Sequence, residues 1–209
     1  GRRRAVGIVL AAHRSPASWE AYLTAVAEAQ KTLGEAAPVV DYVAPWFDHP
    51  LFIEALAART LQTLRTVPEE RRAGASLVFT AHSIPVERSR QAGYAEGLSR
   101  TAGLVAERLG IRAWSLAYTS RSGNPRDPWL EPDIGDALRD LRPGGARDVV
   151  VSPIGFVSDH VEVLYDLDIA ARRTAGEIGL GFFRAGTAGD HPGFTQLLST
   201  LVRDVIARA

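Results

Sequence analysis

The side chains that could carry chemistry are histidines and carboxylates placed near the ends of predicted strands. An imidazole with a carboxylate and open positions suits a divalent metal that binds transiently. Histidine also titrates near neutral pH, so the same groups could accept protons during a reaction. Taken singly, each of them could equally be a helix cap or a solvated surface group. The set comprises His13, His82, His160, Asp159, Glu162 and Asp166.

The densest group lies in residues 148–168, where a short apolar run predicts a buried strand. A proline and a glycine break this run, and a helical pattern follows them. Glu162 and Asp166 are four residues apart, so they share one face of the predicted helix. A helix N-terminus favours carboxylates because its free N–H groups carry partial positive charge. Two interpretations stay open: Asp159 caps the helix and the others are solvated, or the carboxylates handle a metal.

Composition excludes several classes of function. The chain has 209 residues with 24 basic and 24 acidic side chains, whereas nucleic-acid binders usually carry a basic excess. It contains no cysteine, which excludes disulfides, zinc–thiolate centres and cysteine-ligated iron–sulfur clusters. The sequence also lacks an apolar run long enough to span a membrane, a glycine-rich phosphate loop, an H-E-x-x-H helix and a G-x-S-x-G elbow.

Apolar runs alternate with helical patterns along the whole chain, which predicts an α/β protein with parallel sheet and right-handed crossovers. Ligands in such folds bind outside the carboxyl ends of the strands. Strands are predicted at residues 5–11, 39–43, 76–80, 114–120, 149–151 and 181–184. Helices are predicted at residues 17–33, 51–64, 94–109, 132–142, 159–178 and 193–209.

The pattern Ala-His-x-x-Pro occurs twice, at residues 12–16 and 81–85, each time between a predicted strand and a predicted helix. It indicates either two similar α/β halves, each with a histidine at its ligand-facing rim, or a chance match of three residues. The polar segment 66–74 is the best candidate boundary. We therefore expect one half at residues 1–72, a second at 73–185, and a C-terminal helix at 186–209 that packs back on the first half.

Four blocks of sequence, in order and at suitable spacing, resemble ferrochelatases. They are residues 79–85 (FTAHSIP), 118–123 (YTSRSG), 128–132 (PWLEP) and 153–166 (PIGFVSDHVEVLYD). Weaker similarity covers nearly all of the chain. The lack of cysteine resembles the bacterial forms that act on coproporphyrin rather than the cluster-bearing forms. The family's N-terminal portion has no counterpart in this chain.

The resemblance implies a chelatase fold of two doubly wound parallel-sheet halves, with a porphyrin in the cleft between them and the first half incomplete. It implies insertion of ferrous iron, a substrate, into coproporphyrin III or protoporphyrin IX during heme biosynthesis. The alternatives are a cobalt or nickel chelatase of another tetrapyrrole and a non-catalytic tetrapyrrole-binding relative. We also expect action in the cytoplasm, with transient contact to a membrane or to another enzyme of heme biosynthesis.

The resemblance also implies roles for single residues. His82 would face the macrocycle as base or metal ligand, and Glu162 would be its catalytic partner across the ring. Asp166 would continue an acidic track on the same helix, and Asp159 and His160 would complete the metal-handling block. The side chains expected against the porphyrin are Tyr118, Trp129, Phe156 and His13.

Overall fold

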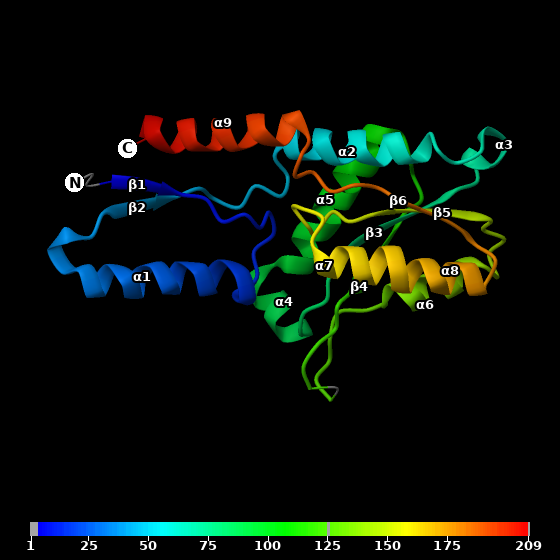
Figure 1. The fold of residues 1–209 in the computed structure, drawn as a ribbon, viewed down its shortest axis with the longest axis horizontal. Coiled ribbons are helices and arrows are strands. Elements are labelled where there is room, and N and C mark those ends of the chain that lie inside the picture. The colour runs from blue at the N-terminus through cyan, green and yellow to red at the C-terminus, as the bar shows by residue number, and fades with distance from the viewer. Residues whose placement is uncertain (1–3, 125, 209) are drawn as a thin grey trace.

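The computed structural model describes residues 4–124 and 126–208, and it shows an α/β protein (Figure 1). Within these residues, the larger sheet is parallel throughout and has the strand order β4–β3–β5–β6. Its strands are β3 (Ser76–His82), β4 (Ser115–Thr119), β5 (Asp148–Ser152) and β6 (Gly181–Arg184). The strands β1 (Arg4–Gly7) and β2 (Val39–Tyr42) pair in parallel in a separate sheet. The predicted α/β class with parallel sheet is confirmed.

Helices connect the strands. Those that cover the larger sheet are α2 (Pro50–Leu64), α5 (Tyr94–Leu109), α6 (Ile134–Leu141), α7 (Val161–Val163), the π-helix η3 (Leu164–Ala171) and α8 (Arg172–Glu177). The others are the π-helix η1 (Pro16–Glu20), α1 (Ala21–Leu33), the 3₁₀-helix η2 (Gly34–Ala36), α3 (Glu69–Arg72), α4 (Val86–Ala92) and α9 (Pro192–Arg208).

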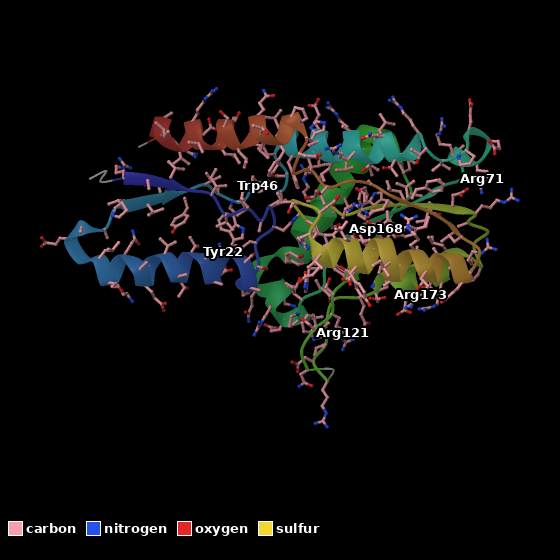
Figure 2. The ribbon with its side chains drawn as sticks, in the orientation of Figure 1. Tyr22, Trp46, Arg71, Arg121, Asp168 and Arg173 are labelled. Carbon is pink, nitrogen blue, oxygen red and sulfur yellow. The ribbon has the colours of Figure 1, made fainter. Side chains whose placement is uncertain are left out.

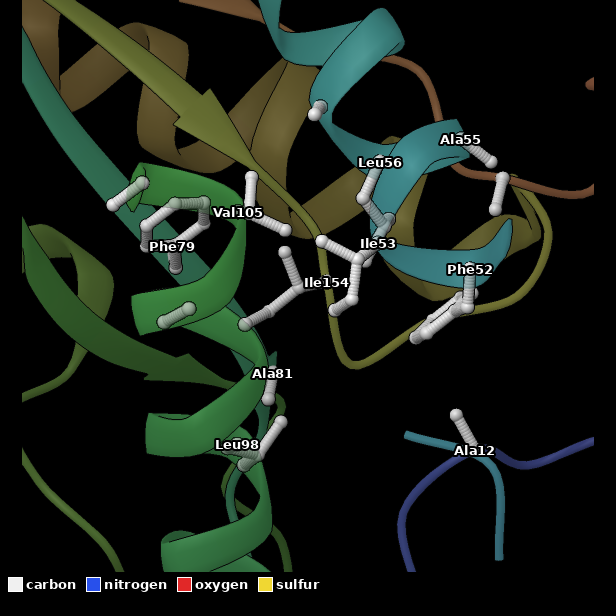
Figure 3. Packing of buried hydrophobic residues seen from close by; sticks show 14 of the residues in the cluster. Ala12, Phe52, Ile53, Ala55, Leu56, Phe79, Ala81, Leu98, Val105 and Ile154 are labelled. Atoms are coloured by element: carbon white, nitrogen blue, oxygen red, sulfur yellow. The ribbon is translucent and has the colours of Figure 1, made fainter. Parts of the chain in front are cut away.

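Alternate residues of β3 face opposite sides of the larger sheet, as the two-residue period of a strand requires. Phe79 and Ala81 enter one apolar cluster together with Leu56 of α2 and Val105 of α5 (Figure 3). Val78 enters a second cluster on the other side, to which α6, η3 and α8 contribute. Both faces of the sheet are therefore buried at this strand, which explains why its sequence is a continuous apolar run.

The sheet of β1 and β2 is much more exposed than the larger sheet. Every residue of α1 is at least partly exposed, including Tyr22 and Leu33. In contrast, α9 contacts α2 and β1, and Figure 1 shows it extending away from the start of α2 over the sheet of β1 and β2. The helix α2 also packs against α5 and β5, so the apolar core is continuous across the expected boundary at 66–74. The division into domains stays a prediction.

The strand predicted at residues 5–11 is shorter than expected, because β1 ends at Gly7. Beyond it, the carbonyl oxygens of Val9 and Ala11 accept hydrogen bonds from the indole N–H groups of Trp46 and Trp19, at 3.4 and 2.9 Å. Side chains thus satisfy backbone groups that a strand ladder would use. The sequence also does not predict α4, because its seven residues carry no apolar stripe.

Candidate active site

His82 ends β3, at the carboxyl edge of the larger sheet where ligands bind in such folds. Its Nδ1 atom lies 2.6 Å from the carbonyl oxygen of Ser83, which can only accept a hydrogen bond. Nδ1 therefore carries the proton of the neutral ring, and Nε2 keeps its lone pair. The Tyr94 hydroxyl donates to the His82 carbonyl oxygen at 3.1 Å. Burial, helped by the charge of Tyr118, raises the pKa of Tyr94, so this hydroxyl remains a donor.

Glu162 lies in α7, and its Oε2 atom is 3.8 Å from Nε2 of His82. Both atoms offer lone pairs when the imidazole is neutral, so they attract a proton or a cation between them. A divalent ion with bonds of about 2.1 Å to a nitrogen and an oxygen would bridge a gap of this size. The side chains of His82 and Glu162 are 33% and 54% exposed, so an ion can reach them from solvent.

The expectation that Glu162 lies across a bound ring from His82 stays a prediction, and the observed distance favours a pair on one face of a ring instead. A flat macrocycle needs about 3.5 Å of contact distance on each face, so groups on opposite faces stand about 7 Å apart. The 3.8 Å between Nε2 and Oε2 is too short to admit a ring between them. The two side chains form a close pair in the lining of one cavity.

The turn after β5 brings Glu162 to His82. The N–H of Gly155 donates to the carbonyl oxygen of Thr80 at 3.1 Å, which holds the turn against β3. A Cβ atom on Gly155 would lie 2.4 Å from Cβ of Ala81, so only glycine permits this approach. The contact is made next to the end of β3, and it fixes where the following helix can start.

His160 begins that helix. Its Nδ1 atom accepts a hydrogen bond from the N–H of Val163 at 3.5 Å, in the manner of an N-cap. The ring of Phe156 meets the ring of His160 edge-on, with 5.3 Å between their centroids. The cap and the ring contact explain the position of the His160 side chain. They also orient the first helical turn, which carries Glu162.

A cavity of about 600 Å³ opens beside the His82–Glu162 pair. This volume falls in the range of about 300–1,000 Å³ that small-molecule sites occupy. The predicted site residues that line it are His13, His82, Trp129, Phe156, His160 and Glu162. Residues that the sequence did not predict also line it, namely Ser15, Pro16, Ala17, Ser18, Tyr22, Arg88 and Ser122.

The wall formed by η1 and the start of α1 follows the first Ala-His-x-x-Pro copy, and Tyr22 projects from it (Figure 2). The opposite wall comes from residues around the second copy and from the turn after β5. In the sequence, the lining residues from Ser15 to Tyr22 lie within or directly after the first Ala-His-x-x-Pro copy. That position was the signal that could have identified them. Arg88 had no comparable signal, because an isolated arginine in a polar helix is common.

His13 lies in the wall of the cavity and is 4% exposed. The Thr101 hydroxyl donates its proton to the carbonyl oxygen of Phe47 at 2.8 Å, so Nε2 of His13 donates to Thr101 Oγ1 at 2.9 Å. Aromatic rings surround the imidazole, with Phe47 stacked at 5.8 Å and Tyr94 edge-on at 6.2 Å. Burial lowers the pKa of His13 to about 3, so the ring is neutral at physiological pH.

Three predicted site residues do not line this cavity. Asp166 accepts a hydrogen bond from the hydroxyl of Ser120, and both line a small adjacent cavity. Ser120 has a φ of 60°, a left-handed conformation that is strained for serine. Tyr118 lines another neighbouring cavity, and burial raises its pKa. Asp159 pairs with Arg184, whose Nη1 atom is 3.0 Å from Asp159 Oδ1.

The number of possible metal ligands is small. Across residues 4–124 and 126–208, no group of three or more histidine, cysteine, aspartate or glutamate side chains is placed to hold a metal ion. A resident structural ion usually takes four protein ligands. His82 and Glu162 are the two candidate ligands that lie within 3.8 Å of each other.

Comparison with known proteins identifies relatives over the whole chain. The family model described as ferrochelatase matches residues 1–206. The coproporphyrin III ferrochelatase of Mycolicibacterium smegmatis is 40% identical over 209 residues, which cover 99% of this chain and 62% of the relative. That of Nocardia farcinica is 44% identical over 187 residues, which cover 86% of this chain and 53% of the relative. The chain thus spans less than two thirds of the length of these relatives.

A solved structure shares the fold. The structure of SirB from Bacillus subtilis with Fe3+ matches with a TM-score of 0.70 and 12% identity, covering 98% of this chain and 72% of that one. At this low identity the likeness shows the fold alone. It confirms the chelatase-like fold expected from the sequence.

The buried neutral state of His13 makes stability depend on pH. In the unfolded chain His13 takes up a proton below the ordinary histidine pKa of 6.5, whereas the folded chain resists protonation down to about pH 3. The contribution of His13 to the free energy of unfolding is therefore fully present above pH 6.5 and is lost as the pH falls towards 3. Between pH 7 and pH 5 the loss is about 2 kcal/mol.

Urea unfolding of wild type and His13→Gln at pH 7 and pH 5 checks this effect. The glutamine keeps a donor for Thr101 but cannot titrate. Between pH 7 and pH 5, the free energy of unfolding of the wild type should fall by about 2 kcal/mol more than that of the variant. Equal losses in the two proteins would contradict the buried neutral imidazole.

Proposed function

Since this chain belongs to the ferrochelatase family, we propose that it carries the catalytic cleft of an enzyme that inserts ferrous iron into coproporphyrin III in heme biosynthesis. The observation that carries the proposal is the pair of His82 Nε2 and Glu162 Oε2, 3.8 Å apart beside the 600 Å³ cavity. The names of the curated relatives support coproporphyrin III as the porphyrin. The relatives are longer than this chain, so the activity of the whole protein is part of the proposal.

The reaction requires a base and a metal ligand. A free-base porphyrin carries two pyrrole protons, and both leave as a divalent ion binds the four nitrogens. The neutral Nε2 of His82 accepts one proton in our proposal, because its lone pair faces the cavity side of the pair. Glu162 contributes a carboxylate that ligates the incoming ion and takes the other proton. Both groups act from the same side of the ring.

The surrounding residues hold the ring and lead protons away. Trp129 and Phe156 line the cavity as apolar contacts, and the buried His13 adds an uncharged part of the wall. Asp166 lies one turn beyond Glu162 and is fixed by Ser120, so we propose it as the next proton acceptor rather than a first ligand. His160 acts by setting the helix start. The contribution of Tyr118 to porphyrin binding stays a prediction.

Arg88 gives the cleft a cationic rim. It is exposed and lines the cavity, and among the described residues no ion pair involves it. Coproporphyrin III carries propionate carboxylates on its edge, and a guanidinium binds carboxylates well. We propose that Arg88 binds one of these propionates.

We also propose where the protein acts in the cell and which other molecules it contacts. In the described part of the chain, no helix is long and apolar enough to cross a membrane. Val161, Tyr165 and Ile169 nonetheless expose apolar side chains along the helix that carries Glu162. These side chains support the expected transient contact with a membrane or with another enzyme of the pathway.

The central experiment replaces the pair and separates binding from insertion. His82→Ala and Glu162→Gln should each slow ferrous iron insertion at least about a hundredfold, because each removes a proton acceptor or ligand. Coproporphyrin III should still bind with a Kd within about threefold of wild type, because neither side chain supplies much contact area. Porphyrin absorbance under anaerobic conditions reports both quantities.

The control is Glu107→Gln, an exposed carboxylate on α5 that does not line the cavity. It should leave both insertion and binding unchanged. Retained turnover in either His82→Ala or Glu162→Gln would rule out the assigned roles.

Arg88→Ala tests the proposed propionate contact. An exposed guanidinium–carboxylate pair is worth up to about 1 kcal/mol, so the Kd for coproporphyrin III should rise about threefold to fivefold. A porphyrin without carboxylates should bind both proteins equally. The matched control is Arg90→Ala on the same helix, since Arg90 pairs with Glu87 and does not line the cavity. An equal loss for both porphyrins would contradict a propionate contact.

A further inference from the structure

Arg184 is the last residue of β6 and lies between two carboxylates of the segment that carries the candidate catalytic helix. Its Nε atom donates to Asp168 Oδ1 at 2.8 Å, and its Nη1 atom donates to Asp159 Oδ1 at 3.0 Å. Nη1 also donates to the carbonyl oxygen of Ala185 at 3.1 Å. Three acceptors therefore hold the guanidinium in one orientation.

The environment of Arg184 makes this contact stronger than a surface ion pair. Its side chain is 13% exposed, compared with 35% for Asp159 and 28% for Asp168. Burial opposes the charged form, but the hydrogen bond to Asp168 and the charge of Asp159 outweigh it and raise the pKa of Arg184. Hydrogen bonds between charged groups at such distances are roughly twice as strong as neutral ones. Removing this cation would take away the ion-pair partner of Asp159 and would leave Asp168 with the longer contact to Arg172.

Asp159 and Asp168 lie at the two ends of the segment that contains Glu162. Asp159 precedes His160 and Glu162, and Asp168 follows Asp166 on η3, where Figure 2 labels it. Arg184 itself is fixed to the sheet, because β6 pairs with β5 and Ala185 donates its N–H to the carbonyl oxygen of Val151 at 2.8 Å. One side chain thus ties both ends of the segment to a strand.

We propose that Arg184 is a positioning residue, which holds the segment 159–168 against the sheet so that Glu162 meets His82. It also occupies Asp159 and Asp168, which leaves Glu162 as the carboxylate of this segment that lines the main cavity. This proposal rests on the function proposed above, and it assigns Asp159 a structural contact where the sequence predicted a metal ligand.

Arg172 provides a matched comparison. It also contacts Asp168, with Nη2 3.5 Å from Oδ1, but its side chain is 52% exposed and lies over the Phe182 ring. It reaches one end of the segment and not Asp159. Arg172→Gln therefore removes a nearby cation while both contacts of Arg184 stay in place.

The test uses Arg184→Gln, Arg184→Lys and Arg172→Gln in this chain, with two independent measurements. In iron insertion, Arg184→Gln should lower kcat at least about tenfold, because displacements of about 1 Å at a catalytic group carry costs of that order or more. KM for the porphyrin should stay within about twofold, because most of the cavity lining lies outside residues 159–168. Arg184→Lys should recover part of kcat, and Arg172→Gln should match wild type.

Hydrogen exchange of backbone amides gives the second measurement, and it does not depend on turnover. In Arg184→Gln, exchange should accelerate at least about tenfold in peptides covering residues 159–168 and not in β5. Unchanged exchange in that segment would overturn the proposal, and so would acceleration throughout the sheet or an unchanged kcat. If the wild type inserts no iron at all, the proposed function fails, and the exchange pattern alone then decides whether Arg184 is the tether.

Discussion

In the proposed function, two lone pairs 3.8 Å apart set the chemistry of this protein. The Ser83 carbonyl oxygen fixes the proton of His82 on Nδ1, and Nε2 is thereby directed at the carboxylate of Glu162. Such a pair is poorly satisfied by itself and gains energy when a proton or a divalent ion lies between its atoms. In the proposed function, the two ligands hold the iron substrate only until the porphyrin takes it up.

The fold serves to bring these two atoms together from distant parts of the chain. His82 ends a central strand, whereas Glu162 follows the neighbouring strand β5 and the turn pressed onto β3 through Gly155. The polar links around this turn are as important as the apolar core, because packing alone does not determine the rotation of a short helix. Arg184 supplies such a link by joining the segment to the sheet at Asp159 and Asp168.

Much of this arrangement could be predicted from sequence, because periodicity and strand ends are local signals. The helix at 94–109 and the strand at 181–184 have the predicted bounds, and His82 and Glu162 line the same cavity as expected. The closeness of His82 Nε2 to Glu162 Oε2 could not be predicted, since it depends on the path of a turn whose closeness to β3 only the structure reveals. The contacts of Ser120 and Arg184 join residues 16 to 46 positions apart, and no local pattern marks them.

Anomalous diffraction from crystals of the chain, grown anaerobically with ferrous iron and N-methylated coproporphyrin III, which cannot complete metal insertion, tests the central claim most directly. The account predicts an iron peak within about 2.5 Å of both His82 Nε2 and Glu162 Oε2, distances typical of metal–ligand bonds. It also predicts the macrocycle in the adjacent cavity, with both side chains on the same face. A ring lodged between the two side chains, or iron bound away from them, would contradict the account.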